Sequence, residues 1–456
     1  MQLMHPRLAL LSRTCLVLAL HCEFAGSINS PGIVSLRVAA EVSTAGASGF
    51  AFFEIDGDAF LLSANFWDGT SGEMSADNVL FSVSERGGVE LELRETQRLP
   101  GRGGHGADAF ATPQGQHYVT IPFYYGCGGG ETRGRVAHDA PCRATGVYKW
   151  DRRKKILIET QRLATAGPAS TGHLITRDGA VYIFVGENFA DEVSFWRLVR
   201  SSAGAERFER AGQVACPGAG AMAVWEGSGS GSGSGYSLFL AAASYHDNGW
   251  TVRSRLFRAD ASTASSSLAF EAAGDLPGFG AHGVEVLQGA GAGAGTWAGA
   301  GAVAGTAFLF ISHDRGPNGP SVNSTGFYIS GGSGSGSGSG EAQISHAASL
   351  PTDGAHGAAL FYGPDGAAYA FVANFGDRLG GRVASHSHLW RRDTGNKQLW
   401  IREASVESFG ATDATHFIWR GRHFVALANE GDIGKRMHQR SFVYEVVLDT
   451  ANGRDL

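Results

Sequence analysis

One short pattern recurs along this chain and determines what the chain can fold into. The pattern is a turn of small residues, an apolar strand, a tight turn, a second apolar strand that often ends in Asn, and a third strand with an aromatic residue. Clear copies begin at Gly46, Gly103 and Asp353. Because a single copy cannot bury its own apolar face, stacked copies must share a core. The repeat therefore fixes the architecture and shifts the functional question from catalysis towards binding.

The second strand of the pattern occurs seven times. Its apolar residues alternate over short runs separated by Gly and Asp, which indicates β-strands. The seven copies of this strand begin at Phe60, His117, Val181, Tyr236, Ala307, Tyr369 and His423. A third strand follows each copy, and a fourth leads into the next. This count predicts an all-β fold within residues 33–449, a seven-bladed β-propeller of four-stranded antiparallel blades. The blades are expected to start near residues 46, 103, 168, 218, 280, 354 and 410.

The two ends of the predicted propeller indicate how the ring closes. The last copy stops after its third strand, near Leu448. An additional strand, at residues 33–44, precedes the first copy. We expect this strand to complete the last blade, because closure removes exposed sheet edges that would otherwise invite aggregation.

The N-terminal residues are typical of an export signal. Residues 1–26 combine Arg7 and Arg13 with a short apolar stretch, as a signal peptide does. This stretch is shorter than the roughly 20 apolar residues that a membrane-spanning helix needs. We therefore expect a secreted or cell-surface protein without membrane insertion. The formal net charge of −6 argues against nucleic acid as a partner, because an acidic surface does not attract it.

Cysteine and asparagine positions predict two covalent modifications. Cys127 and Cys142 flank a Gly-rich segment and are candidates for a loop-closing disulfide bond. Asn323, in the sequence Asn-Ser-Thr, would be glycosylated if the chain enters the secretory pathway. Cys216 starts an apolar strand and is expected to be a buried, small hydrophobic residue.

Loops of a four-stranded propeller divide into two sets. Those between strands one and two and between strands three and four lie on one face, which receives the low-complexity insertions at 227–235, 289–305 and 331–340. Such tracts are flexible and cannot bury a core. Loops between strands two and three and between blades lie on the opposite face, here called the loop-rich face.

The loop-rich face is the expected contact site for a partner protein. Aromatic and Arg residues on loops of a rigid scaffold are typical of such sites. The candidate anchors are Phe66, Trp67, Tyr124, Tyr125, Tyr245, Trp250, Arg378 and Arg382. In the alternative interpretation, several of these aromatic side chains cap the blade beneath them.

Ionisable residues of the innermost strands are expected near the channel axis. One column of the repeat contains His105, His282 and His356. Three histidines could ligate a metal ion, but a repeated His more often makes a structural hydrogen bond to a neighbouring blade. Possible oxygen ligands for Ca²⁺ are Asp108, Glu285 and Asp413. Isolated, hydrated or loop-bonded carboxylates are the favoured interpretation, so no cofactor is expected.

Several short motifs recur within the copies. They are the Q-x-L tail at 97–99 and 161–163, the Gly-Ala-His stretch at 280–282 and 354–356, the F-x-x-x-D-G turn at 52–57, and the strand end at 63–66 and 372–375. On these motifs the units resemble the EAR repeat, also called EPTP, of the leucine-rich glioma-inactivated proteins and a few other extracellular animal proteins. The resemblance implies a seven-bladed propeller that binds another protein outside the cell. The copy around Cys216 lacks the His and the Asp-Gly pair, and no leucine-rich domain is present, so the identity of the partner does not carry over.

The sequence favours a non-catalytic module that binds an extracellular protein or a cell-surface receptor. One alternative is a propeller hydrolase with a metal or acid/His site at the channel mouth, although the chain contains neither a G-x-S-x-G elbow nor a P-loop. The observation that discriminates is whether four residues converge in one polar pocket: Asp108, Glu285, His282 and His356. The other alternative is a component of the extracellular matrix or wall, in which the low-complexity tracts are spacers.

Overall fold

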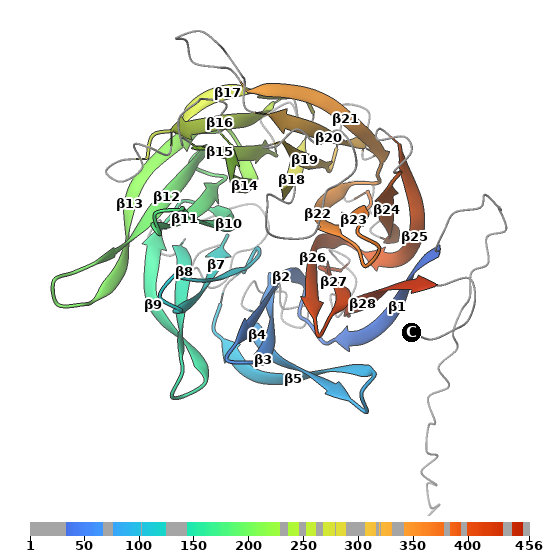
Figure 1. The fold of residues 1–456 in the computed structure, drawn as a ribbon, viewed down its shortest axis with the longest axis horizontal. Coiled ribbons are helices and arrows are strands. Elements are labelled where there is room, and N and C mark those ends of the chain that lie inside the picture. The colour runs from blue at the N-terminus through green and yellow to red at the C-terminus, as the bar shows by residue number, and fades with distance from the viewer. Residues whose placement is uncertain are drawn as a thin grey trace, which may run out of the picture.

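The computed structural model shows seven four-stranded antiparallel sheets arranged in a ring (Figure 1). It describes residues 33–66, 76–101, 103–124, 144–228, 236–245, 252–260, 268–278, 280–288, 306–315, 319, 321–330, 342–377, 384–393, 399–431 and 440–449. The predicted seven-bladed propeller is therefore confirmed. Within these ranges no helix is long and apolar enough to cross a bilayer. The expected signal peptide at 1–26 and both cysteines of the expected disulfide, Cys127 and Cys142, lie outside the described residues.

Each blade is a meander of four strands. Blade 1 contains β2 (Ala47–Ile55), β3 (Asp58–Asn65), β4 (Asn78–Arg86) and β5 (Glu90–Leu99), and blade 2 contains β6 (Asp108–Ala111), β7 (His117–Phe123), β8 (Ala144–Asp151) and β9 (Ile156–Ala164). Blade 3 contains β10 (Pro168–Ile175), β11 (Val181–Glu187), β12 (Glu192–Arg200) and β13 (Glu206–Ala215), and blade 4 contains β14 (Ala219–Ser228), β15 (Tyr236–Ser244), β16 (Ser254–Asp260) and β17 (Glu271–Leu276). Blade 5 contains β18 (Ala281–Gln288), β19 (Ala307–His313), β20 (Asn323–Ser330) and β21 (Gln343–Pro351), and blade 6 contains β22 (Ala355–Tyr362), β23 (Ala368–Asn374), β24 (Ala384–Arg392) and β25 (Trp400–Phe409). Blade 7 contains β26 (Ala411–Trp419), β27 (Arg422–Asn429), β28 (Ser441–Asp449) and β1 (Ile33–Val42).

Two residues assigned from the sequence to a flexible insertion belong to a strand. Gly227 and Ser228 extend β14 and pair with Ser237 and Tyr236 of β15. The rest of the three expected insertions, at 229–235, 289–305 and 331–340, lies outside the described residues.

The N-terminal strand closes the ring, as predicted. β1 pairs antiparallel with β28 from Ile33 opposite Asp449 to Val42 opposite Ser441. Every outer strand carries a β-bulge at the same place in the repeat, with the extra residue at Thr96, Thr160, Ala211, Ala273, Ala347, Glu403 or, in β1, Ala39. Such a bulge bends the strand and increases its twist. β1 therefore has the same local design as the six outer strands that follow directly on their own blades.

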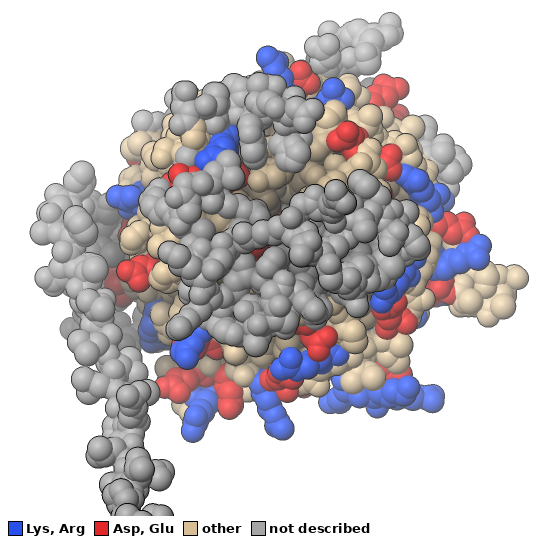
Figure 2. All heavy atoms as spheres, turned by 180° about the vertical axis from the view of Figure 1, so that it is seen from behind, with Lys and Arg blue, Asp and Glu red and all other residues tan. Residues whose placement is uncertain are grey.

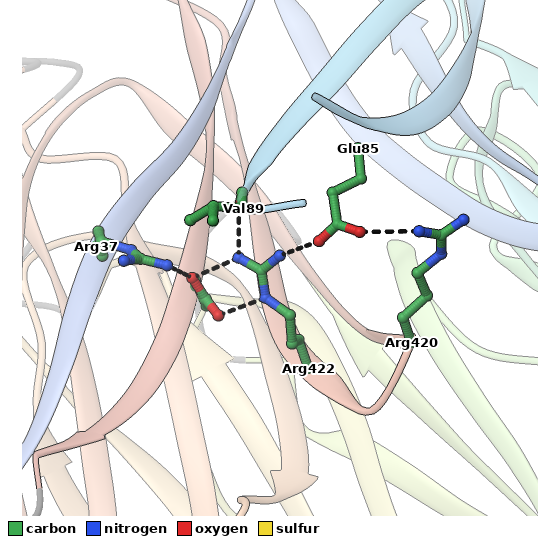
Figure 3. A network of polar contacts seen from close by, with 6 residues as sticks. Arg37, Glu85, Val89, Arg420 and Arg422 are labelled. Carbon is green, nitrogen blue, oxygen red and sulfur yellow. Dashed lines mark hydrogen bonds and ion pairs between the residues drawn. The ribbon is translucent and has the colours of Figure 1, made fainter. Parts of the chain in front are cut away.

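A network of charged side chains fastens this closure (Figure 3). Glu445 of β28 accepts hydrogen bonds from Arg37 of β1 and from Arg422 of β27, the latter at 2.7 and 2.8 Å. Arg422 also donates to Glu85 of blade 1 at 2.9 Å, and Arg420 donates to the other carboxylate oxygen of Glu85 at 2.8 Å. Burial acts to raise the pKa of Glu445, but the hydrogen bonds from Arg422 and Arg37 outweigh it, and the pKa is lowered. The network joins β1, blade 7 and blade 1.

The hydrophobic core lies between neighbouring blades. At the closure, Phe417 and Phe424 of blade 7 belong to one buried cluster with Phe50 and Leu61 of blade 1. The rings of Phe52 and Phe417 stack with centroids 4.3 Å apart. Because each cluster needs two blades, a single repeat has no core of its own, which explains why the copies must stack.

The Gln of the Q-x-L motif joins the outer strands of successive blades. The side-chain amide of Gln97 donates to the carbonyl of Leu157 and accepts from its N–H, both at 2.8 Å. Gln161 makes the same pair of hydrogen bonds to Phe208, at 2.7 and 2.8 Å. Each amide therefore pairs with backbone groups of an outer strand, which would otherwise be left to solvent or to another chain.

Candidate binding face and central channel

Seven glycines build an identical frame on the loop-rich face. They are Gly46, Gly103, Gly167, Gly218, Gly280, Gly354 and Gly410, and their φ angles lie between 52° and 64°. The carbonyl of each accepts a hydrogen bond of 2.7–3.1 Å from the backbone N–H of the residue that follows the second strand of its blade. In chain order those residues, here called the rim residues, are Phe66, Tyr124, Asn188, Tyr245, Asp314, Phe375 and Glu430. The glycine frame is thus constant, while the rim residues differ in size, polarity and charge.

Backbone conformation and close packing both require glycine in this frame. Residues with a Cβ rarely adopt such φ values. At Gly354, moreover, a Cβ would lie 2.3 Å from the carbonyl oxygen of Gly376. The frame therefore depends on glycine but places no such demand on the side chain of the rim residue bonded to it.

Asparagine side chains close the bases of three loops. The amide groups of Asn65, Asn374 and Asn429 donate to the backbone carbonyls that precede the third strand or lie near its start, at 2.7, 2.7 and 3.0 Å. In blade 3 the position of Asn65 is taken by Glu187, which accepts from the N–H of Ala166 at 2.6 Å. These hydrogen bonds hold the loops of the loop-rich face at their bases.

The expected anchors differ in exposure. Phe66 is only 6% exposed and packs edge-on against His105, with ring centroids 5.3 Å apart. Tyr124 and Tyr245 are half-buried. The hydroxyl of Tyr124 donates to Asn188 at 3.2 Å and that of Tyr245 donates to Asp314 at 3.3 Å. The remaining candidates lie outside the described residues: Trp67, Tyr125, Trp250, Arg378 and Arg382.

Phe189 is an exposed aromatic residue that the sequence analysis missed. Its side chain is 43% exposed, and its ring packs against Tyr124 with centroids 5.0 Å apart. The Asn-Phe pair at 188–189 matches the strand end at 65–66, but here the Asn occupies the rim position, so the Phe lies one residue further out. The signal was present in the sequence, since the Asn-Phe pair lies one residue further from the preceding Asp-Gly turn in blade 3 than in blade 1.

The three histidines lie at one mouth of the channel. His282 and His356 stack with centroids 3.9 Å apart, and His105 and His282 lie 6.0 Å apart. The Nδ1 atom of His105 lies 2.7 Å from the carbonyl oxygen of Ala169 in the next blade, which is the structural hydrogen bond expected for such a column. His356 is 2% exposed, and its Nε2 atom lies 3.2 Å from a carboxylate oxygen of Asp314.

The three carboxylates lie at two depths in the channel. Asp108 and Glu285 occupy equivalent positions of their strands, whereas Asp413 is two positions nearer the histidines and lies between the backbones of Gly49 and Gly357. Burial, together with the charges of Asp413 and Asp108, raises the pKa of Glu285 well above its ordinary value. Burial likewise raises the pKa of Asp413 to about 7, although a hydrogen bond from the backbone of Ala414 opposes the shift.

Histidines and carboxylates line one cavity of about 480 Å³. Inside it, a carboxylate oxygen of Asp108 lies 2.8 Å from the Nδ1 atom of His173, on the neighbouring blade. In the described part of the chain, no three His, Cys, Asp or Glu side chains are close enough together to hold a metal ion. The expectation of no cofactor, with Ca²⁺ in the channel as the weaker possibility, stays a prediction.

Charges of both signs are mixed over the described surface visible in Figure 2, where Lys or Arg and Asp or Glu side chains alternate around the periphery. A protein that binds nucleic acid through its backbone usually presents a continuous basic surface instead. The expectation from net charge that nucleic acid is not a partner stays a prediction.

Comparison with known proteins gives no family assignment: no protein-family model and no curated protein matches the sequence. Similar solved structures include BBS1N in complex with ARL6DN, at 8% identity and a TM-score of 0.47, covering 93% of this chain and 99% of that one. Hydrazine synthase of Kuenenia stuttgartiensis matches at 12% identity and a TM-score of 0.45, covering 86% and 94%. SapL1 lectin in complex with alpha methyl fucoside matches at 13% identity and a TM-score of 0.43, covering 80% and 97%. Likenesses at this level carry no argument about function.

Proposed function

We propose that this chain is a non-catalytic, secreted or cell-surface module of the EAR/EPTP type that binds an extracellular protein through its loop-rich face. The observation that carries the proposal is the glycine frame. Seven identical backbone hydrogen bonds fix the point on one face at which the chain leaves the second strand of each blade. Tyr124 and Tyr245 are half-buried there and the other five rim residues are buried, so the frame holds the bases of the loops in place. A rigid scaffold that carries loops of different sequence is the usual basis of specific recognition.

The hydrogen-bonded loop bases add to this support. Because Asn65, Asn374 and Asn429 hold the loops at their ends, less conformational freedom is lost when a partner binds. An exposed aromatic side chain such as Phe189 is a frequent energetic anchor of protein interfaces. The proposed contact surface is therefore pre-organised and has an anchor among its described residues.

Two exposed apolar residues on opposite faces provide the test. Phe189 lies on the loop-rich face, and Ile418, 51% exposed, lies next to the turn between strands one and two of blade 7, on the opposite face. The full-length chain and its F189A and I418A variants are immobilised, and the extracellular proteins that each retains from medium and cell-surface extract are quantified. Extracellular proteins should be retained by the wild type and I418A, and at least roughly tenfold less by F189A. Equal retention by all three, or retention of intracellular proteins alone, would refute the proposal.

A hydrolase in the channel is the second candidate function, because one observation favours it. All four discriminating residues line the same cavity: Asp108, Glu285, His282 and His356. The raised pKa of Glu285 suits a general acid, and His173, oriented by Asp108, suits a general base. The test is turnover of chromogenic esters and glycosides by the wild type and E285Q. Turnover that E285Q abolishes would support an enzyme, and no turnover by the wild type would count against it.

A further inference from the structure

The structure describes six asparagines, and one differs from the other five. The five are buried and hydrogen-bonded through their side chains: Asn65, Asn78, Asn188, Asn374 and Asn429. Asn323 is exposed at the first position of β20, and its side-chain amide makes no hydrogen bond to any described residue. The fold therefore uses the other asparagines to fix loops but assigns no such role to Asn323.

The residues after Asn323 alternate between the interior and solvent, as a strand requires. Ser324 is fully buried, and its hydroxyl accepts from the N–H of His313 at 3.2 Å and lies 3.0 Å from the hydroxyl of Thr352. Thr325, the next residue, is half-buried. Asn323 thus points outward while Ser324 is held inward, so the amide of Asn323 stays accessible in the folded protein.

Ser324 is part of the propeller repeat, but Asn323 and Thr325 are not. Serines at the same place accept the equivalent backbone hydrogen bond in blades 4, 6 and 7: Ser254, Ser387 and Ser441. The positions equivalent to Asn323 in these blades are Arg253, His386 and Arg440, and those equivalent to Thr325 are Arg255, His388 and Phe442. Folding of the blade therefore accounts for Ser324 but requires neither the Asn nor the Thr that completes the acceptor pattern.

We propose that Asn323 carries an N-linked glycan. This inference rests on the secretory location in the proposed function. The amide nitrogen of Asn323 forms a C–N bond to C1 of a lipid-linked oligosaccharide, the lipid diphosphate leaves with the bonding electrons, and the amide gives up one proton. Recognition of the acceptor needs the hydroxyl of Thr325 two residues on. No oxidant or metal redox step is involved.

The glycan would divide the loop-rich face. Asn323 lies at the end of β20 that follows the loop between strands two and three of blade 5, opposite Pro351 at the end of β21. In Figure 1, β20 and β3 lie on opposite sides of the ring. A glycan at blade 5 therefore shields that sector and leaves the sector of blades 1 to 3, which contains Tyr124 and Phe189, for the partner.

Expression of the full-length chain in secreting eukaryotic cells tests the modification. Protein from the medium is measured by mass spectrometry before and after treatment with peptide N-glycosidase F, which converts a glycosylated Asn to Asp. We expect a glycan mass at Asn323 that disappears in the T325A variant and persists in T325S, the matched control that keeps the acceptor pattern. A secreted chain that is unmodified at Asn323, or a chain found only inside the cell, would overturn the inference.

Folding and binding are measured separately, so that each proposal can fail alone. Urea unfolding of enzymatically deglycosylated wild type, T325A and T325S shows whether loss of the glycan reflects a folding defect, and we expect equal midpoints. The retention test with F189A and I418A is repeated on deglycosylated protein. A glycan at Asn323 with equal retention by both variants would refute the proposed contact face and leave the modification standing. An unmodified Asn323, together with retention lost only in F189A, would refute the glycosylation and leave the proposed contact face standing.

Discussion

Glu445 holds the two ends of the ring together, and the E445Q variant tests how much the closure contributes to stability. The carboxylate is 8% exposed and accepts a bidentate hydrogen bond from Arg422 as well as one from Arg37. A charge-assisted hydrogen bond contributes about 1.5–3 kcal/mol. The pair with Arg37 adds about 0–1 kcal/mol, because the Arg37 side chain is more than half exposed. Gln keeps the shape and one acceptor oxygen, so we expect E445Q to lower the free energy of unfolding by about 2–3 kcal/mol.

Urea unfolding at pH 7, followed by tryptophan fluorescence, measures this change. The expected result is a lower midpoint with an unchanged slope, which identifies a change in stability and not in the unfolded state. The matched control is E209Q, because Glu209 pairs with Arg207 on one outer strand and both side chains are exposed. E209Q should cost less than about 0.5 kcal/mol. An equal midpoint for E445Q and the wild type, or an equal loss in E209Q, would refute a special role for Glu445 at the closure.

The pH dependence gives an independent check of the same interaction. The pKa of Glu445 is lower in the folded protein than its ordinary value of 4.5. Its contribution to stability is therefore fully present above pH 4.5 and is lost as the pH falls through the folded-state value. The difference in stability between the wild type and E445Q should be constant from pH 7 to pH 5 and should close at lower pH. A difference that stays the same at pH 3 would contradict the assignment of the effect to the carboxylate charge.

Three further predictions concern the frame, the blade contacts and the channel. G354A should lower the free energy of unfolding by about 2–3 kcal/mol, because φ is 59° and the new Cβ would lie 2.3 Å from the carbonyl oxygen of Gly376. The control is G366A in the same blade, where a new Cβ meets nothing within 4 Å. G366A should cost about 1 kcal/mol in the same urea assay. Q97A removes both hydrogen bonds to the backbone of the next blade and should cost about 1 kcal/mol at the urea midpoint. D413N should stabilise the protein increasingly as the pH rises from 3.8 to about 7, by up to about 4 kcal/mol at pH 8, because ionisation then destabilises the folded wild type. Equal urea midpoints for D413N and the wild type at pH 8 would contradict this.

Blade number and ring closure could be predicted because their signals are local and repeated. Alternation of apolar residues and the turns between them recur in every copy, so an error in one copy does not change the count. The strand at 33–44 was recognisable because the last copy lacked a partner for β28. The structure adds a reason why this strand can complete the last blade, which no sequence pattern showed. The bulge at Ala39 gives β1 the geometry of every other outer strand.

Positions within a blade were harder to predict, because one extra residue changes which side chain is buried. Phe66 and Phe189 each directly follow an Asn, yet Phe66 is buried and Phe189 is nearly half exposed. The difference arises because the rim position falls on Phe66 itself in blade 1 but on Asn188 in blade 3, so that Phe189 lies one residue beyond the rim. Side-chain contacts between neighbouring blades were likewise beyond the sequence, as the pair of Asp108 in blade 2 and His173 in blade 3 shows. The repeat aligns residues within their blades but does not give distances between blades.

The structure separates residues that the fold requires from residues that it leaves unexplained. Gly354 is required by backbone geometry, Gln97 by the pairing of outer strands, and Asn65 by the closure of a loop. Each of these recurs in other blades with the same contacts. Phe189 and Asn323 are different, because both are exposed and no repeated contact of the propeller needs them. Exposing an aromatic ring to water is unfavourable, and an exposed Asn adds no hydrogen bond to the fold. Residues of this kind on one face, around a frame that the fold holds constant, are therefore the best places to look for what the protein binds and how it is modified.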